Sequence, residues 1–131
     1  MRELHDHKVN PANDTLSIEV QDEPGAGGAC HKYVIGPYDD SSNPSADPEM
    51  VGLKRSVILF QNGAINEVGV NGLTHEALLA IVADRLRSFQ AGPFACKANA
   101  CALTKIEEAQ HWLQQRTLER MRRGVEGTHA K

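Results

Sequence analysis

Apolar and polar positions alternate along the first half of the chain, which is the pattern of half-buried β-strands. In the segment TLSIEV (15–20), Leu16, Ile18 and Val20 fall on one face. The segments HKYVI (31–35) and RSVILF (55–60) are rich in β-branched, aromatic and other apolar residues. The pattern therefore predicts three short strands.

Between these strands lie segments that cannot continue a strand. Residues 22–29 and 36–52 are rich in glycine, proline, aspartate and serine, which supply turn geometry. The longer of the two is expected to be a mobile surface loop. Residues 1–14 show no period and are expected to be flexible.

The second half changes to a helical period. After an irregular connector at 60–72, Thr74 is a suitable helix N-cap, and apolar residues recur at helical spacing over 75–90. Gly92-Pro93 ends this helix, and a second helix is predicted to begin there with Pro93 in its first turn and to run to about Arg123. Gly124 can adopt the left-handed conformation that ends helices.

These elements predict one α+β domain over residues 1–131: a small N-terminal antiparallel sheet followed by a C-terminal antiparallel two-helix hairpin. Its parts are a flexible start (1–14), a strand-rich half (15–72), the helical hairpin (73–124) and a tail (125–131). At about 1.5 Å per residue, the helices are roughly 25 and 45 Å long, so the second overhangs the first. The overhang has only Leu118 and Met121 to bury, and we expect another subunit to cover it.

Composition narrows the function. The net charge of −3 argues against a general binder of DNA or RNA polymers. The longest apolar run, ALLAIVA (77–83), is far shorter than the roughly 20 residues that span a bilayer, so no membrane partner is expected. Three cysteines without a C-x-x-C pair favour neither disulfides nor a metal site, and they fit a reducing cytoplasm. No nucleophile with a neighbouring base is recognisable, so we expect a binding protein without cofactor, metal or catalytic residues.

Arginines near the C-terminus are the main candidate site. Arg116, Arg120 and Arg123 have i, i+4, i+7 spacing, which places three guanidiniums on one helix face. Cations in a last turn also complement the helix dipole, so one or two would be ordinary. Three aligned arginines repel one another, which favours an anion or a neighbouring subunit's carboxylate between them.

Phe89 and Asn99 are two further candidates, each with two interpretations. Phe89, beside the Gly92-Pro93 turn, is either a core residue or a surface on which a nucleobase stacks. Asn99 is a poor interior helix residue, so its amide is expected to bond either a loop carbonyl or a ligand.

Several short motifs occur in order within residues 70–128: D-R-L, F-Q-x-G-P-F-x-C, N-A, A-L-T-K, E-E-A, W-L and R-T-x-x-R-x-x-R-G-V-E-G-T. Together they resemble the helical hairpin shared by the first class of phage Thoeris anti-defence proteins and the anti-CBASS cyclic-nucleotide sponges. The strand segments before the hairpin resemble the N-terminal sheet of the Thoeris class, which we therefore favour.

This resemblance implies a non-catalytic sponge in the host bacterial cytoplasm that sequesters immune second messengers before they activate an effector. The ligands implied are glycocyclic ADP-ribose isomers and, in a separate site, cyclic di- or trinucleotides. By position, Phe89 and Asn99 match residues lining the ADP-ribose-type pocket, and Arg116 and Arg120 match arginines that clamp phosphate. The implied assembly is a homo-hexamer built as a trimer of dimers, or at least a dimer.

The family also recruits basic residues from the sheet half, and Lys54 and Arg55 are the candidates here. Three alternatives stay open from the sequence. A hydrolase of the same messengers would need a metal or a general base. A nucleic-acid module would place the arginine helix in a groove. An assembly-only hairpin would pair the arginines with a neighbour's glutamates.

Overall fold

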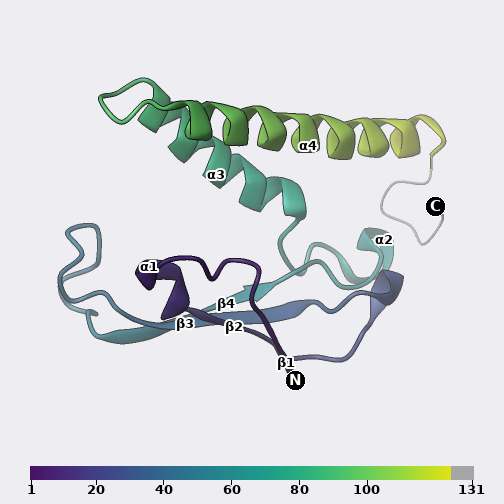
Figure 1. Ribbon diagram of the computed structural model, residues 1–131. Helices are drawn as coiled ribbons and strands as arrows, with labels where there is room; N and C mark the ends of the chain where they lie inside the picture. The colour runs from purple at the N-terminus through teal and green to yellow at the C-terminus, as the bar shows by residue number, and fades with distance from the viewer. Residues whose placement is uncertain (125–131) are drawn as a thin grey trace. The chain divides into compact units, whose positions relative to one another are not determined.

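The computed structural model describes residues 1–124 of the chain, and the predicted tail at 125–131 lies outside the described residues. The chain forms two compact units, Met1–Asn62 and Gly63–Lys131, and each is described by itself. The first unit holds the strands β1 (Arg2–Leu4), β2 (Ser17–Val20), β3 (Lys32–Asp39) and β4 (Leu53–Leu59), with α1 (Pro11–Asp14) and the 3₁₀ turn η1 (Ala26–Gly28). The second holds α2 (Ile65–Val68), α3 (His75–Gln90) and α4 (Lys97–Arg122) (Figure 1). The predicted α+β class is confirmed.

The sheet is an antiparallel meander in the order β1-β2-β3-β4. Directly paired residues share a face, so the register gathers the apolar positions of all four strands on one side. Val20, which is 1% exposed, is the most deeply buried large side chain of the described chain. The residues of this apolar face are Leu4, Ile18, Val20, Tyr33, Ile35 and Ile58.

The opposite face of the sheet is mixed. Glu19 pairs with Val34, and Val34 pairs with Val57. Arg55, Val57 and Leu59 on β4 are exposed. The alternation over 15–20 correctly placed Ile18 and the buried Val20 on one face of β2, whereas on β3 the side chain of Val34, at 7% exposed, is buried on the opposite face.

The sequence pattern missed two elements before residue 15. Arg2–Leu4 forms β1, which pairs with β2 through Arg2↔Val20, Glu3↔Glu19 and Leu4↔Ile18. Pro11–Asp14 forms the short α1, whose N-cap Asn10 accepts a hydrogen bond from the backbone N–H of Asn13 at 2.8 Å. Three residues are too few to show a period, and β1 is defined only by its backbone pairing with β2.

The segment 36–52, predicted to be one long loop, is partly strand, since β3 continues to Asp39. The remaining loop is closed at its base by Asp40. Its carboxylate accepts a 2.7 Å hydrogen bond from the Gly52 N–H and forms a 3.2 Å ion pair with Lys54. The Gly52 hydrogen bond, helped by Lys54, lowers the pKa of Asp40 below its ordinary value.

The helix boundaries follow from capping. Thr74 caps α3 by accepting a hydrogen bond from the Ala77 N–H, as predicted, and Gly124 follows α4 with φ +72°. The prediction that Pro93 lies in the first turn of the second helix is wrong, because α4 begins at Lys97. Its N-cap is Cys96, whose Sγ accepts a hydrogen bond from the Asn99 N–H, and Pro93 lies in the connecting turn.

The helices α3 and α4 contact each other and are linked by a 3.1 Å ion pair between Arg87 and Glu107. Figure 1 shows them meeting at the 91–96 turn and diverging away from it. Only Ala83 and Arg120 are buried in these two helices. Large apolar side chains are exposed along both, namely Ile81, Val82, Phe89, Trp112, Leu118 and Met121. None of the described helices is long and apolar enough to span a membrane.

Candidate functional site

Phe89 lies in the last turn of α3 and is 40% exposed, so it is not a core residue of the described chain. The guanidinium carbon of Arg85, one helical turn earlier, lies 5.7 Å from the centroid of the Phe89 ring. That distance is within the range of a cation–π interaction. The structure therefore presents an accessible aromatic ring with a cation beside it, a combination that suits a base carrying a phosphate.

Asn99 lies in the first turn of α4, at the same end of the hairpin as Phe89. Two hydrogen bonds set this turn: the Cys96 N–H donates to Gln90 Oε1 at 3.0 Å, and the Asn99 N–H donates to Cys96 Sγ at 3.4 Å. Asn99 is half-buried. Within residues 1–124 its side-chain amide has no hydrogen-bond partner, so the loop carbonyl considered from the sequence does not bind it.

The arginines occupy the other end of α4. Arg116 is exposed, Arg120 is only 7% exposed, and Arg123 is the exposed C-cap residue. Arg120 and Arg123 both have interaction partners, and Arg116 and Arg123 are the two exposed members of the three. Seventeen residues separate Asn99 from Arg116, which is roughly 25 Å along the helix at about 1.5 Å per residue. A single α4 therefore carries two separate candidate sites rather than one.

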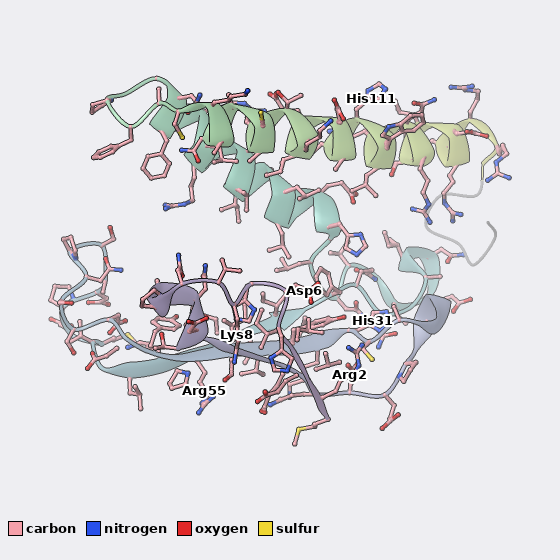
Figure 2. The ribbon with its side chains drawn as sticks, in the orientation of Figure 1. Arg2, Asp6, Lys8, His31, Arg55 and His111 are labelled. Carbon is pink, nitrogen blue, oxygen red and sulfur yellow. The ribbon has the colours of Figure 1, made fainter. Side chains whose placement is uncertain are left out.

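Lys54 and Arg55 belong to the sheet unit. Lys54 is engaged in the loop closure, since its ammonium forms the ion pair with Asp40 and also donates to the Met50 carbonyl. Arg55 is exposed on the mixed face of the sheet, and Figure 2 shows it on the side opposite Asp6. Of these two candidates, only Arg55 is an exposed cation.

Sequence reasoning missed two residues at the Phe89 end of the hairpin. Arg85 was part of the D-R-L motif, and its i, i+4 spacing to Phe89 could have indicated the contact. Cys96 was interpreted as a small apolar residue, whereas its thiol caps α4 by accepting a hydrogen bond from the Asn99 N–H, and the helix begins at Lys97. In residues 1–124, no group of three or more His, Cys, Asp or Glu side chains is arranged to hold a metal ion.

Comparison with known proteins agrees with the arrangement of the hairpin. Residues 54–118 match the family model of the Acb2/Tad1 hairpin domain. The chain is also similar to Thoeris anti-defense 1 from Bacillus phage SBSphiJ7. The two are 36% identical over 146 aligned positions, and the alignment covers the whole of both chains. The similarity thus includes the sheet unit as well as the hairpin.

Proposed function

This chain belongs to the Thoeris anti-defense 1 family of phage anti-defence proteins, and from that premise we propose that it sequesters a nucleotide second messenger of host immunity. The proposed ligands are glycocyclic ADP-ribose isomers. The protein binds them in the host cytoplasm and does not break them down. The observation that carries this proposal is the exposed Phe89 ring, which lies beside the 91–96 turn at the same end of the hairpin as the open amide of Asn99.

The chemistry of this end of the hairpin suits such a ligand. The π face of a nucleobase stacks on an aromatic ring regardless of the base, which is worth about 1–3 kcal/mol per base. The Asn99 amide offers both a donor and an acceptor to the base or ribose. The Arg85 guanidinium beside the ring provides a charged donor for the pyrophosphate.

Sequestration sets a requirement on affinity. The free messenger must stay below the working concentration of the effector, so a nanomolar Kd, about −12 kcal/mol, is needed. One stacking contact and a few hydrogen bonds on an exposed surface fall short of that value. We therefore place the complete site where a second copy of the chain covers the ligand.

A release experiment tests this function. Purified protein is mixed with each glycocyclic ADP-ribose isomer, the free ligand is quantified after filtration, and the protein is then denatured by heat. Ligand that disappears and returns intact supports sequestration. Ligand that returns as a product identifies the hydrolase alternative, and ligand that never disappears refutes messenger binding and leaves the assembly-only hairpin.

The aromatic pair of the hairpin provides a matched control. Phe89→Ala should weaken binding about 10- to 100-fold, the loss expected for one stacked base. Phe94, in the 91–96 turn, is 72% exposed, and Phe94→Ala should leave the affinity unchanged. Equal losses in the two variants would mean that exposed apolar surface, rather than stacking at Phe89, supports binding.

We also propose a second ligand site at the arginine end of α4, for a cyclic di- or trinucleotide of the CBASS type. Its support is that Arg116 and Arg120 lie one helical turn apart and that Arg116 is exposed. Arg116→Ala should weaken the binding of a cyclic trinucleotide and leave the binding of the ADP-ribose isomer unchanged. Arg122→Ala, which removes another exposed arginine, is the control. Arg120→Ala should also weaken the cyclic oligonucleotide, but Arg120 is buried, so its variant needs a parallel test of folding.

The second half of α4 also favours self-association. Leu118 and Met121 are exposed and lie three positions apart, so they are neighbours on one face of the helix, and Trp112 is exposed on another side. A second copy of the chain that packs on this part of α4 would cover such apolar side chains. A trimer of dimers would bring several copies of Arg116 and Arg120 together around one anion. This homo-hexamer, or at minimum a dimer, is therefore part of the proposal.

A further inference from the structure

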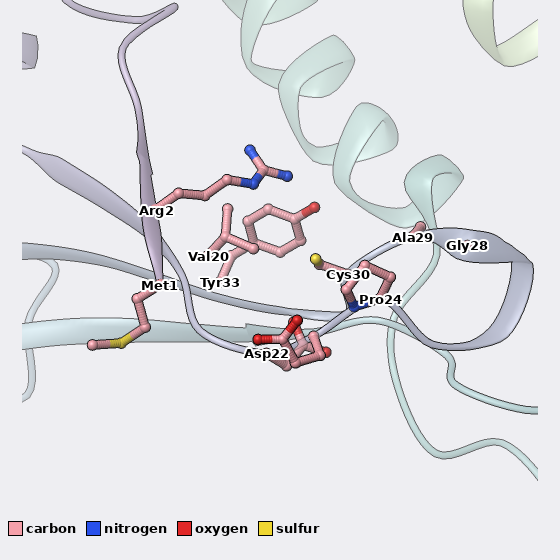
Figure 3. Close-up of a pocket in the computed structure, with 10 residues that line it drawn as sticks. Met1, Arg2, Val20, Asp22, Pro24, Gly28, Ala29, Cys30 and Tyr33 are labelled. Carbon is pink, nitrogen blue, oxygen red and sulfur yellow. The ribbon is translucent and has the colours of Figure 1, made fainter.

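The sheet unit contains a cavity that none of the candidate residues above lines. Its volume is about 390 Å³, and it lies between β1, the end of β2, the 22–30 loop and β3 (Figure 3). Small-molecule pockets commonly measure about 300–1,000 Å³, so it has room for one mononucleotide-sized ligand. All of its lining residues belong to the Met1–Asn62 unit, and the cavity is therefore independent of the hairpin.

The floor of this cavity is apolar and rigid. Arg2, Val20 and Tyr33 form one cross-strand row by register, so their side chains leave the sheet on the same face. Val20 is almost fully buried. The Tyr33 ring is held edge-on by Phe60, with ring centroids 5.7 Å apart and an interplanar angle of 88°. A planar ligand can pack against the partly exposed Tyr33 ring.

The rim of the cavity is set by the carboxylate of Asp22. It accepts hydrogen bonds from the backbone N–H groups of His31, at 2.9 and 3.0 Å, and of Lys32, at 3.1 Å. Desolvation raises the pKa of Asp22, but these bonds outweigh it and lower the pKa below its ordinary value. The 22–30 loop is thus tied to β3, and Asp22 stays ionised at neutral pH as an acceptor at the rim.

Arg2 has the one cationic side chain among the residues that line the cavity. In the described part of the chain it forms no ion pair, although Asp22 and Glu23 line the same cavity. Figure 3 shows its side chain extending over the floor, with the guanidinium near the hydroxyl end of the Tyr33 ring. The positive group therefore faces the space that a ligand would fill.

From these positions we infer a second small-molecule site, specific for a ribonucleoside monophosphate. The base packs on the partly exposed Tyr33 ring, the phosphate pairs with the Arg2 guanidinium, and the ribose hydroxyls donate to the acidic rim at Asp22 and Glu23. This combination of one cation, one acidic rim and one aromatic floor matches the three chemical parts of a nucleotide. The site is separate from the proposed messenger site, and neither depends on the other.

Cys30 lines the cavity and provides a direct reporter. AMP is titrated into the protein during alkylation by iodoacetamide, and each cysteine is quantified by peptide mass spectrometry. AMP should slow the modification of Cys30 in a saturable way. Cys96 and Cys101, both exposed on the hairpin, should react at unchanged rates and serve as internal controls. Adenosine, which lacks the phosphate, should protect Cys30 at least about 10-fold less effectively.

Two variants test the role assigned to Arg2. Arg2→Ala should raise the AMP concentration needed for half-protection about 10-fold or more, as expected for a lost charge-assisted contact. Arg55→Ala removes the same charge from the other face of the same sheet and should have no effect. Equilibrium dialysis of AMP against the wild type and both variants gives the same comparison without relying on thiol reactivity.

Any one of four results would overturn the inference. The first three are no AMP binding at millimolar concentration, equal effects of Arg2→Ala and Arg55→Ala, and equal protection by adenosine and AMP. Protection of Cys96 instead of Cys30 would also overturn it, because it would place AMP at the hairpin. The messenger proposal is tested apart from this one, since Phe89→Ala should weaken messenger binding while leaving the protection of Cys30 unchanged.

Discussion

Gly36, in β3, provides a sharp test of the sheet geometry. It has φ +151°, a backbone conformation that residues with a Cβ rarely adopt. A Cβ added there would lie 2.9 Å from Arg55 Cγ, 3.0 Å from the Lys54 carbonyl oxygen and 3.1 Å from Arg55 Cα. Gly36→Ala therefore combines a strained conformation with a clash against the backbone of β4.

Gly52 separates these two costs. Its φ of +147° is nearly the same, but an added Cβ there would have no atom within 4 Å. Gly52→Ala should cost about 1–3 kcal/mol for the conformation alone. Gly36→Ala should cost the same plus about 1–3 kcal/mol for forcing β3 and β4 apart. In a unit of this size, each further kcal/mol lowers the thermal midpoint by about 4–8 °C.

Thermal unfolding followed by circular dichroism, with hydrogen exchange of the β3 and β4 amides, measures the difference between the two variants. Gly36→Ala should have the lower midpoint and the faster exchange across the β3–β4 ladder. Equal destabilisation by Gly36→Ala and Gly52→Ala would refute the reasoning, since it would show that the close approach of the two strands has no energetic weight.

Three further predictions concern the loop, the hairpin and the assembly. Because the pKa of Asp40 is lowered, its ionised carboxylate stabilises loop closure at pH values above 3.8, the ordinary pKa of aspartate, and this stabilisation is lost as the pH falls through the lower pKa of the folded state. Hydrogen exchange of the Gly52 amide should accelerate in that low pH range. Asp40→Asn should abolish this pH dependence. Cys96→Ser, which keeps an acceptor at the α4 N-cap, should leave the helix about 0.5–1 kcal/mol more stable than Cys96→Ala does, as measured by urea unfolding. Leu118→Glu should shift the proposed oligomer toward smaller species in light scattering, whereas Gln115→Glu, an exposed change of the same charge, should not.

The sequence predicted those elements whose side chains carry a period. In β2 the apolar residues Ile18 and Val20 alternate with polar ones, while β3 and β4 were recognised from their β-branched and apolar content. β1 is defined by backbone pairing with β2, which leaves no period in three residues. The α3 start was predictable because threonine is a common cap, and the α4 start was not, because the cap is the Cys96 thiol and its geometry depends on Gln90.

The candidate sites were predictable to different degrees, because some depend on spacing within one helix and others on the pairing of separate strands. Helical spacing relates Arg116 to Arg120 directly, so their neighbourhood on α4 follows from the sequence. The row of Arg2, Val20 and Tyr33 depends on the register of three strands, and a shift of one residue would turn each side chain to the other face. The engagement of Lys54 by Asp40 likewise depends on how the loop closes.

The exposure of the candidate ligand-binding residues relates the two proposed activities of the hairpin, which are ligand capture and self-association. The Phe89 ring is accessible, the Asn99 amide is open in the described chain, and Arg116 lies roughly 25 Å further along α4. Nanomolar affinity for a small nucleotide requires most of its surface to be buried, which these residues of one chain do not achieve on their own. The apolar surface that α4 exposes beyond the turn is what a second copy would cover. A second copy that covers this part of α4 also reaches the Arg116 end of the helix, so a variant that weakens assembly should weaken capture of the cyclic oligonucleotide proposed for that end as well.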